Sequence, residues 1–116
     1  MKRTGLSVAV ALLAMAGAVQ AQEQRTAKVA QCTGLQPAEV AAQVKRDYLQ
    51  NRITRWASDK KLLGTATPIA WVSPETITGK DAIWQVPLRV RGTKQDKTYN
   101  VTLDCNVGEI TYSEPQ

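Results

Sequence analysis

The fold of this chain is decided by the stretch Ile83-Trp84-Gln85-Val86-Pro87-Leu88-Arg89-Val90-Arg91. Apolar residues alternate with polar ones along it, and this period of two predicts a β-strand with one buried face and one solvated face. A second alternating run, residues 98–105, follows after a polar loop. Two such neighbouring runs predict an antiparallel ribbon that needs a cover on its apolar side.

One long helix is predicted to supply that cover. Pro37 suits a first helical position, the apolar residues after it recur at helical spacing to about Lys61, and Gly64 is placed to end the helix. The apolar stripe drifts by about a quarter turn, which indicates a bend, a twisted sheet beneath the helix or two packing partners. Short strands are expected around 69–72 and 109–112, so the sequence predicts an α+β fold with one long N-terminal helix packed on an antiparallel sheet of about four strands.

The chain begins with a pattern typical of a secretory signal peptide. Lys2 and Arg3 precede an apolar run at 6–16 that is too short to span a bilayer, and small residues allow cleavage after Ala21. An uncleaved membrane anchor is the alternative. We therefore expect a signal peptide at 1–21, a flexible polar arm at 22–31 and a single domain at 32–116, with a fraying tail after Tyr112. The product is expected to be secreted by way of the periplasm, with no stable membrane anchor after cleavage.

The two cysteines, Cys32 and Cys105, are expected to form a disulfide, as cysteine pairs in small exported proteins usually do. The bridge would join the start of the helix to the second long strand. It would close a loop of 74 residues, counted from Cys32 to Cys105 inclusive, for which chain entropy gives a stabilisation of roughly 4 kcal/mol. Redox chemistry is disfavoured, because the sequence has no Cys-x-x-Cys motif and no histidine.

The composition argues against most enzyme classes. The absence of histidine removes His-based triads and most zinc sites, and no phosphate loop, dinucleotide fingerprint or close carboxylate pair occurs. We therefore predict no catalytic residues, no metal and no cofactor. Loss of Lys2 and Arg3 with the signal peptide lowers the net charge from +5 to +3, which is too weak a charge to indicate a nucleic-acid partner.

Two groups of residues are candidates for binding. Tyr48, Arg52 and Arg55 fall on one helical face with Trp56 beside them, and these residue types anchor protein interfaces. The sequence thus offers a docking face for a protein partner. The alternative is a buried tyrosine and tryptophan flanked by solvated arginines, one of them paired with Asp59.

The second candidate is a cationic patch on the sheet, formed by Arg89, Arg91, Lys94 and Lys97. Such a patch would suit a phosphate or an acidic partner. The alternative is a set of solvated charges that keeps the sheet soluble and its edge unpaired.

Several motifs, in order and spacing, resemble those of the YebF family of exported bacterial proteins. They are Cys32-Thr33-Gly34-Leu35, Val44-Lys45-Arg46-Asp47-Tyr48-Leu49-Gln50-Asn51-Arg52, Arg55-Trp56-Ala57-Ser58-Asp59, Ala70-Trp71-Val72-Ser73, Gly79-Lys80-Asp81, Trp84-Gln85-Val86-Pro87-Leu88, Val90-Arg91-Gly92 and Asp104-Cys105. The resemblance implies a small exported α+β protein with one disulfide and brings no catalytic residues. The family is grouped with the colicin M immunity protein, a periplasmic toxin inhibitor that keeps its N-terminal segment as a membrane anchor, and this chain departs from that relative by its cleavable-looking signal.

These observations favour a non-enzymatic protein that acts by binding another protein, either an envelope protein met during export or a toxin. A module that binds anionic envelope components through the cationic patch is the hypothesis from a second class. Toxin immunity of the colicin M type is a further alternative.

Overall fold

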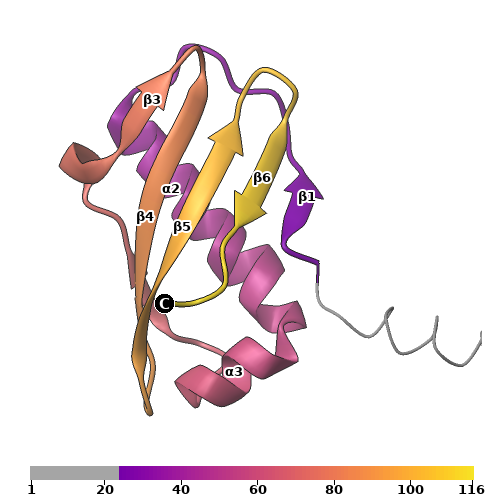
Figure 1. Cartoon of the computed structure of the whole chain (residues 1–116), viewed down its shortest axis with the longest axis vertical. Coiled ribbons are helices and arrows are strands. Elements are labelled where there is room, and N and C mark those ends of the chain that lie inside the picture. The colour runs from indigo at the N-terminus through magenta and orange to yellow at the C-terminus, as the bar shows by residue number, and fades with distance from the viewer. Residues whose placement is uncertain (1–23) are drawn as a thin grey trace, which may run out of the picture.

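The computed structural model describes residues 24–116, so the predicted signal peptide at 1–21 lies outside the described residues. One antiparallel sheet packs with one face on a helix, and in Figure 1 the strands lie in front of that helix. The elements in chain order are β1 (Thr26–Lys28), α2 (Pro37–Asp47), η1 (Tyr48–Arg52), η2 (Ile53–Arg55), α3 (Ala57–Leu63), β2 (Ile69–Trp71), η3 (Pro74–Thr76), β3 (Thr78–Lys80), β4 (Ile83–Arg91), β5 (Asp96–Asp104) and β6 (Glu109–Tyr112). Within residues 24–116, no helix has the length and apolar character that crossing a membrane requires.

The sheet confirms the α+β prediction but has six strands where about four were expected. Its order is β1-β6-β5-β4-β2, and β3 also pairs with β4. The long strands β4 and β5 pair along their whole length, from Ile83 opposite Asp104 to Arg91 opposite Asp96. The strands that escaped prediction, β1 and β3, are three residues long, which is too short for an alternating pattern to stand out.

Pro87 lies in the middle of β4, a position that a central strand rarely tolerates. It stands opposite Asn100, whose backbone N–H and carbonyl both bond Ser113 on the other side of β5. Pro87 is therefore in a pair that exchanges no hydrogen bonds, and its nitrogen points to the gap between β2 and β3. The missing N–H of proline costs nothing there.

The predicted continuous helix from Pro37 to Lys61 is wrong, because it is interrupted between α2 and α3. A π-helical turn (η1) and a 3₁₀ turn (η2) follow α2, and Trp56 (φ −102°, ψ 86°) separates them from α3. Gly64 ends α3 in the left-handed conformation, as predicted. A short strand precedes the helix, so the helix is not the N-terminal element.

The interruption follows from the spacing of the buried residues. Val44 and Tyr48 are four residues apart, but the next buried residue, Ile53, is five further on and Trp56 three beyond that. A π-turn closes with an i→i+5 bond, here between the Ile53 N–H and the Tyr48 carbonyl, and a 3₁₀ turn advances by three. The two irregular turns therefore keep Tyr48, Ile53 and Trp56 on the face that packs against the sheet. The drift of the apolar stripe seen in the sequence is the result of these turns.

The polar arm was predicted to be flexible, and its described part is instead built into the fold. Thr26–Lys28 forms β1, whose residues pair with β6 from Thr26 opposite Thr111 to Lys28 opposite Glu109. The Tyr112 N–H donates to the Arg25 carbonyl (2.9 Å), which extends the pairing by one residue. The prediction failed because apolar and polar residues do not alternate clearly along the arm. Its strand is formed by backbone hydrogen bonds to the edge of β6, which the side-chain pattern does not reveal.

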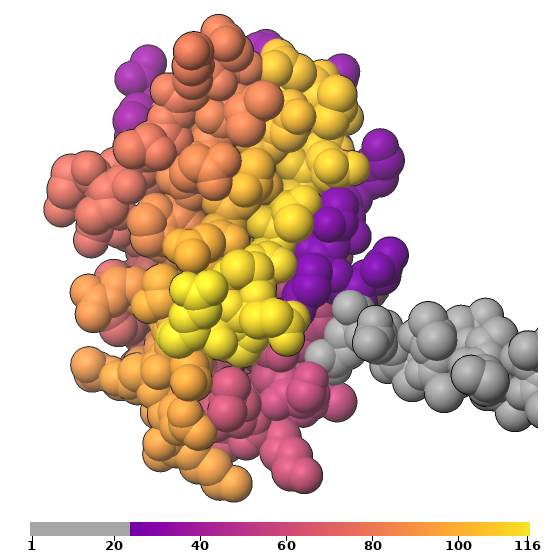
Figure 2. All heavy atoms as spheres, viewed as in Figure 1, coloured from indigo at the N-terminus to yellow at the C-terminus, as the bar shows by residue number. Residues whose placement is uncertain are grey.

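The tail after Tyr112, which was expected to fray, is held to β5 by backbone hydrogen bonds. Thr98 and Gln116 exchange two backbone hydrogen bonds of 2.9 Å, and the Ser113 N–H donates to the Asn100 carbonyl. In Figure 2 the yellow C-terminal residues lie against orange residues of the sheet. The tail thus continues along the edge of β5 where β6 ends.

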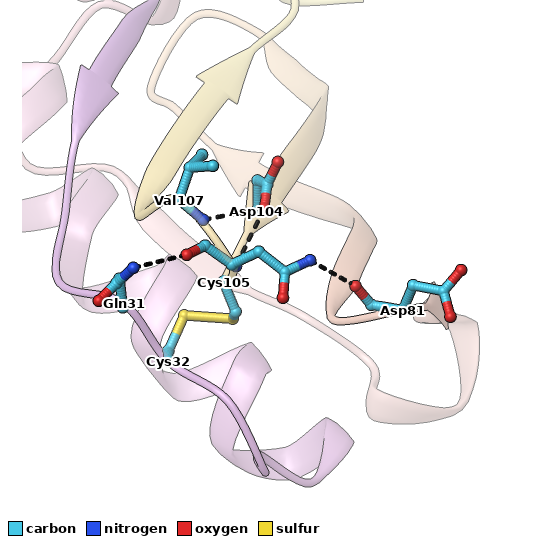
Figure 3. Close-up of a disulfide and its surroundings, with 7 residues drawn as sticks. Gln31, Cys32, Asp81, Asp104, Cys105 and Val107 are labelled. Atoms are coloured by element: carbon cyan, nitrogen blue, oxygen red, sulfur yellow. Dashed lines mark hydrogen bonds between the residues drawn. A yellow bond between two sulfur atoms is a disulfide. The ribbon is translucent and has the colours of Figure 1, made fainter.

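The predicted disulfide between Cys32 and Cys105 is present, with a Cα–Cα distance of 4.4 Å (Figure 3). It joins the segment before α2 to the end of β5, as expected. Beside the disulfide, the Cys32 backbone N–H donates a hydrogen bond to the Cys105 carbonyl (3.0 Å), and the Gln31 side chain donates to the Asn106 carbonyl (2.7 Å). The bridge therefore holds the arm, the helix and the sheet at one point.

Replacing both cysteines by serine is expected to lower the free energy of unfolding by about 2–4 kcal/mol, because the unfolded chain regains the entropy of a long open loop. Urea denaturation followed by tryptophan fluorescence measures this change. The double variant and the reduced wild-type protein should have the same free energy of unfolding. A midpoint of unfolding that is unchanged in both would contradict the structural role of the bridge.

Candidate functional site

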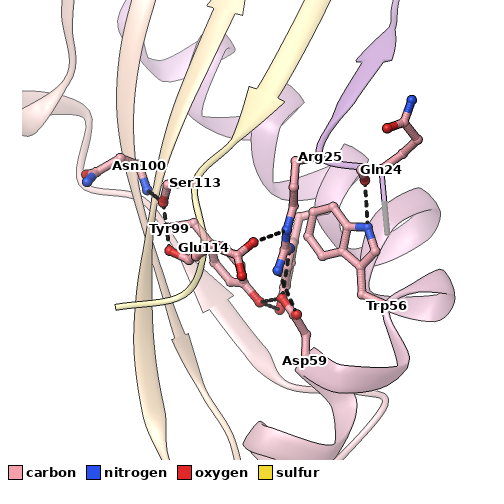
Figure 4. Close-up of polar contacts among 9 residues, drawn as sticks. Gln24, Arg25, Trp56, Asp59, Tyr99, Asn100, Ser113 and Glu114 are labelled. Carbon is pink, nitrogen blue, oxygen red and sulfur yellow. Dashed lines mark hydrogen bonds and ion pairs between the residues drawn. The ribbon is translucent and has the colours of Figure 1, made fainter. Parts of the chain in front are cut away.

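The most elaborate polar arrangement in the described structure surrounds Asp59, whose side chain is only 2% exposed. Arg25 from the arm donates two hydrogen bonds to the carboxylate, of 2.8 and 3.0 Å, and the Tyr99 hydroxyl donates a third of 2.6 Å. The Arg25 guanidinium also lies over the Trp56 ring (4.2 Å) and pairs with Glu114 (2.8 Å), as Figure 4 shows. A buried carboxylate needs such compensation, because losing its hydration is costly.

A second buried carboxylate, Asp47, lies at the end of α2. It accepts hydrogen bonds from the Tyr112 hydroxyl (2.6 Å), from Arg52 (3.0 and 3.3 Å) and from Asn51 (3.3 Å). Each buried aspartate is therefore held by one tyrosine and one arginine. Among the described residues, no buried side-chain polar atom lacks a hydrogen-bond partner.

Four aromatic rings connect the two carboxylate sites. The ring centroids of Tyr48, Trp56, Tyr99 and Tyr112 lie between 5.0 and 6.2 Å apart. The Tyr48 hydroxyl donates to the Tyr99 hydroxyl (3.2 Å), and the Trp56 indole N–H donates to the Gln24 carbonyl (2.9 Å). These rings contribute both buried apolar area and favourable tilted and edge contacts.

The surroundings strongly favour the neutral form of all three tyrosines. Burial raises the pKa of Tyr48 to about 12. Burial, followed by the hydrogen bond to Asp59, raises the pKa of Tyr99 further, and burial with the Asp47 charge does the same for Tyr112. Burial by itself would lower the pKa of Arg25, but the Asp59 and Glu114 carboxylates outweigh it and raise that pKa.

This interior network holds the fold together and presents no reactive group. The carboxylate oxygens of both aspartates accept hydrogen bonds from other side chains, and the hydroxyls of Tyr99 and Tyr112 donate their protons to them. Residues 24–116 contain no cluster of three or more Cys, Asp or Glu side chains that could hold a metal ion. The arrangement therefore explains stability, and binding has to be sought on the surface.

The docking face predicted on the helix is wrong in its two aromatic residues. Tyr48 is fully buried and Trp56 is 2% exposed, because both pack in the aromatic cluster against the sheet. Arg52 is bound to Asp47 through a 3.0 Å ion pair and is itself largely buried. Arg55 alone of the four is exposed. The predicted pairing of Asp59 with a helix arginine is also wrong, since Asp59 binds Arg25.

The outer face of the sheet, which the helix does not cover, carries the other predicted residues Arg89 and Arg91. Both are exposed, and their guanidinium carbons lie 5.3 and 5.8 Å from the centroid of the Trp71 ring on β2. Trp71 stands directly opposite Arg89 in the register of the two strands. Ile69, two residues earlier and on the same face, is 64% exposed. We call Ile69, Trp71, Arg89 and Arg91 the Trp71 surface.

The remaining two cations of the predicted patch, Lys94 and Lys97, do not belong to this surface. The backbone of Lys94 donates to the Leu63 carbonyl (2.9 Å), so the turn between β4 and β5 caps the end of α3. Lys97 stands opposite the buried Val90, and its side chain therefore leaves from the face opposite to that of Arg89. The four cations do not converge, because the strand period separates them.

Sequence reasoning missed both Trp71 as a surface residue and Arg25 as a buried one. Trp71 and Ile69 are two residues apart and therefore lie on the same face of the short strand, and the prolines at 68 and 74 indicated an edge strand. These two signals could have placed Trp71 at the surface. Arg25 lies in a segment without an apolar pattern, and only the position of Asp59 in three dimensions reveals its role.

Comparison with known proteins gives a consistent result. A family model described as YebF-like protein matches residues 25–113. A relative from Yersinia pseudotuberculosis named Protein YebF is 57% identical over 115 residues, which span 97% of this chain and 85% of that relative. A Protein YebF from Photorhabdus laumondii is 47% identical over 114 residues, which span 97% and 92%. Neither the family description nor these names states an enzymatic activity, a ligand or a partner.

Replacing Arg25 by glutamine is expected to lower the free energy of unfolding by about 3 kcal/mol, because Asp59 stays buried without its counter-charge. Chemical denaturation of the full chain measures the loss. Arg55→Gln is the matched control and should change stability by less than about 0.5 kcal/mol, since Arg55 is exposed. Equal effects of the two variants would contradict the role given to Arg25.

The three tyrosines are expected to resist ionisation until the protein unfolds in alkali. Their folded pKa values lie above the unfolded value of about 10, so their contribution to stability is complete below pH 10 and is lost as pH rises beyond it. Between about pH 10 and 12 the unfolded chain loses three tyrosine protons that the folded protein keeps. The free energy of unfolding should therefore fall by about 4 kcal/mol per pH unit. Tyrosinate absorbance and tryptophan fluorescence, recorded together, should change in one transition, whereas a tyrosine that ionises near pH 10 in the native protein would refute this account.

Proposed function

Because this chain belongs to the YebF family, we propose that it is a small secreted, non-enzymatic protein that acts by binding another protein. The family match spans residues 25–113, and the alignments cover 85% and 92% of the two relatives. The signal-like pattern at 1–21 supports export, and the disulfide suits an oxidising compartment.

The distribution of residues between interior and surface supports binding rather than catalysis. The buried carboxylates Asp47 and Asp59 are saturated by arginine and tyrosine donors, so neither is poised to exchange a proton with a substrate. The residues that most often dominate protein interfaces, tryptophan and arginine, occur together on the outer face of the sheet.

The single observation that carries this proposal is the Trp71 surface, in which Ile69, Arg89 and Arg91 are exposed and Trp71 is partly exposed. The partly exposed Trp71 ring has two guanidinium groups against it and lies next to an isoleucine that is 64% exposed, and no second layer covers these residues within residues 24–116. Large apolar side chains on a sheet face are normally buried by a second layer, and a face without one is a candidate interface. The helix-borne docking face is not proposed again, because its aromatic residues are buried.

Replacing Trp71 by alanine should abolish capture of the partner while leaving the fold intact. The mature protein, immobilised, would be exposed to envelope extract and to culture medium, and a partner retained in equal molar amount would be identified by mass. An envelope protein and a toxin are both partners of the proposed class. Retention should fall at least tenfold in Trp71→Ala, because the ring is the centre of the surface.

Val107→Ala is the matched control for this experiment, since Val107 is a 57% exposed apolar residue in the turn between β5 and β6. It should retain the partner fully, and both variants should keep the wild-type unfolding midpoint within a few degrees. Capture that survives Trp71→Ala, or that falls equally in both variants, would contradict the proposal.

A further inference from the structure

We infer that the Trp71 surface takes an extended acidic segment of a partner protein, which adds to the free edge of β2 and places a carboxylate against Arg89, Arg91 and the Trp71 ring. The inference deepens the proposed function, on which it rests, by naming the chemistry and conformation of the segment that is recognised.

The charges of the surface favour an anionic ligand. Arg91 has one acidic neighbour, Asp96, at 3.6 Å, while among the described residues no acidic side chain forms an ion pair with Arg89. Two guanidinium groups therefore face one carboxylate, which leaves a net positive charge. Arginine prefers planar, bidentate partners, and a carboxylate or a phosphate provides that geometry.

The space for such a group is present. A hollow of about 240 Å³ lies over β4 and β5, beside the Trp71 surface. It is lined by Trp71, Arg89, Arg91 and Gln116 together with Val90, Asp96, Lys97 and Thr98 of the two strands. A water molecule takes up about 30 Å³ of liquid, so the hollow has room for an acidic side chain together with bound water. Figure 2 shows the molecule from the side of the sheet that faces away from α2, with the C-terminal residues in yellow.

The ion pair between Arg91 and Asp96 identifies a carboxylate as the anion that this site already accommodates. Both side chains are more than 60% exposed and their closest approach is 3.6 Å, so the pair is loose. Exposed pairs of this kind contribute about 0–1 kcal/mol, and an incoming carboxylate can replace Asp96 at little cost.

The edge of the sheet indicates that the carboxylate is carried by an extended chain. β2 is the last strand in the sheet order, so one of its edges has no neighbouring strand among residues 24–116. Proline residues at 68 and 74 bound this edge and limit an added strand to a few residues. Strand addition at a free edge draws affinity from backbone hydrogen bonds and specificity from alternate side chains.

The register then fixes the pattern of the segment. Ile69 and Trp71 project from β2 to the outer face, while Ala70 between them is buried. An added strand would place every second side chain on the same outer face. An acidic residue beside Trp71 and an apolar residue beside Ile69 would therefore be two positions apart, which distinguishes a protein segment from a free phosphate or a lipid headgroup.

The experiment is an NMR titration of the full mature protein with a capped peptide, Thr-Val-Thr-Glu-Thr-Val-Thr, and with its counterpart in which glutamine replaces glutamate. We expect amide shifts confined to 69–72 and 89–91, and an affinity for the glutamate peptide at least fivefold higher. Arg89→Gln should reduce this preference to less than twofold. Lys80→Gln, which removes an exposed cation from β3, should preserve it.

Equal affinity for the two peptides, or shifts outside these segments, would overturn the inference. Preferential binding of phosphatidylglycerol vesicles or inorganic phosphate over the glutamate peptide would also overturn it, in favour of a phosphate site. If the peptides show no preference while partner capture still depends on Trp71, the proposed function stands and only the acidic-segment inference fails. If capture does not depend on Trp71, the proposed function itself fails.

Discussion

The structure depends on the burial of one carboxylate, that of Asp59. A charge so removed from water has to be paired, and its partners come from segments far apart in the sequence: Arg25 from the arm and Tyr99 from β5. The Arg25 guanidinium in turn lies over Trp56 and binds Glu114 in the C-terminal tail. One buried charge thus fixes the arm, the helix and the tail relative to the sheet, with the disulfide as a second point of attachment.

The same requirement explains why the helix is irregular. Tyr48, Ile53 and Trp56 are all buried, and no regular α-helix brings residues at intervals of five and three to one face. The π and 3₁₀ turns supply those intervals and direct Asp47 and Asp59 inward to Tyr112 and Tyr99. The helix face that resembled a protein-docking surface is therefore interior, and the outer face of the sheet, with Trp71, is what remains for a partner.

Much of the fold was predictable because its signals are local. The alternation of apolar and polar residues in 83–91 predicted the long strand β4, and Gly64 predicted the end of the helix. Two cysteines in a chain expected to be exported predicted the disulfide. The arm and the tail were not predictable, since their partners are backbone groups and a carboxylate far away in sequence. The docking face on the helix failed for a related reason: a tryptophan beside arginines has the same composition whether it is buried, like Trp56, or partly exposed at the surface, like Trp71, and only packing separates the two.

The central claim is this division between an interior Trp56 and a surface Trp71, and hydrogen exchange of the indole N–H groups tests it most directly. The chain has three tryptophans, so one set of NMR spectra resolves them all. The Trp56 N–H, bonded to the Gln24 carbonyl and buried, should exchange at least a thousandfold more slowly than a free indole. The Trp71 side chain is partly exposed and its N–H donates no hydrogen bond within residues 24–116, so it should exchange within about tenfold of the free rate. Similar rates for Trp56 and Trp71 would contradict both the docking of the arm and the exposure of the proposed binding surface.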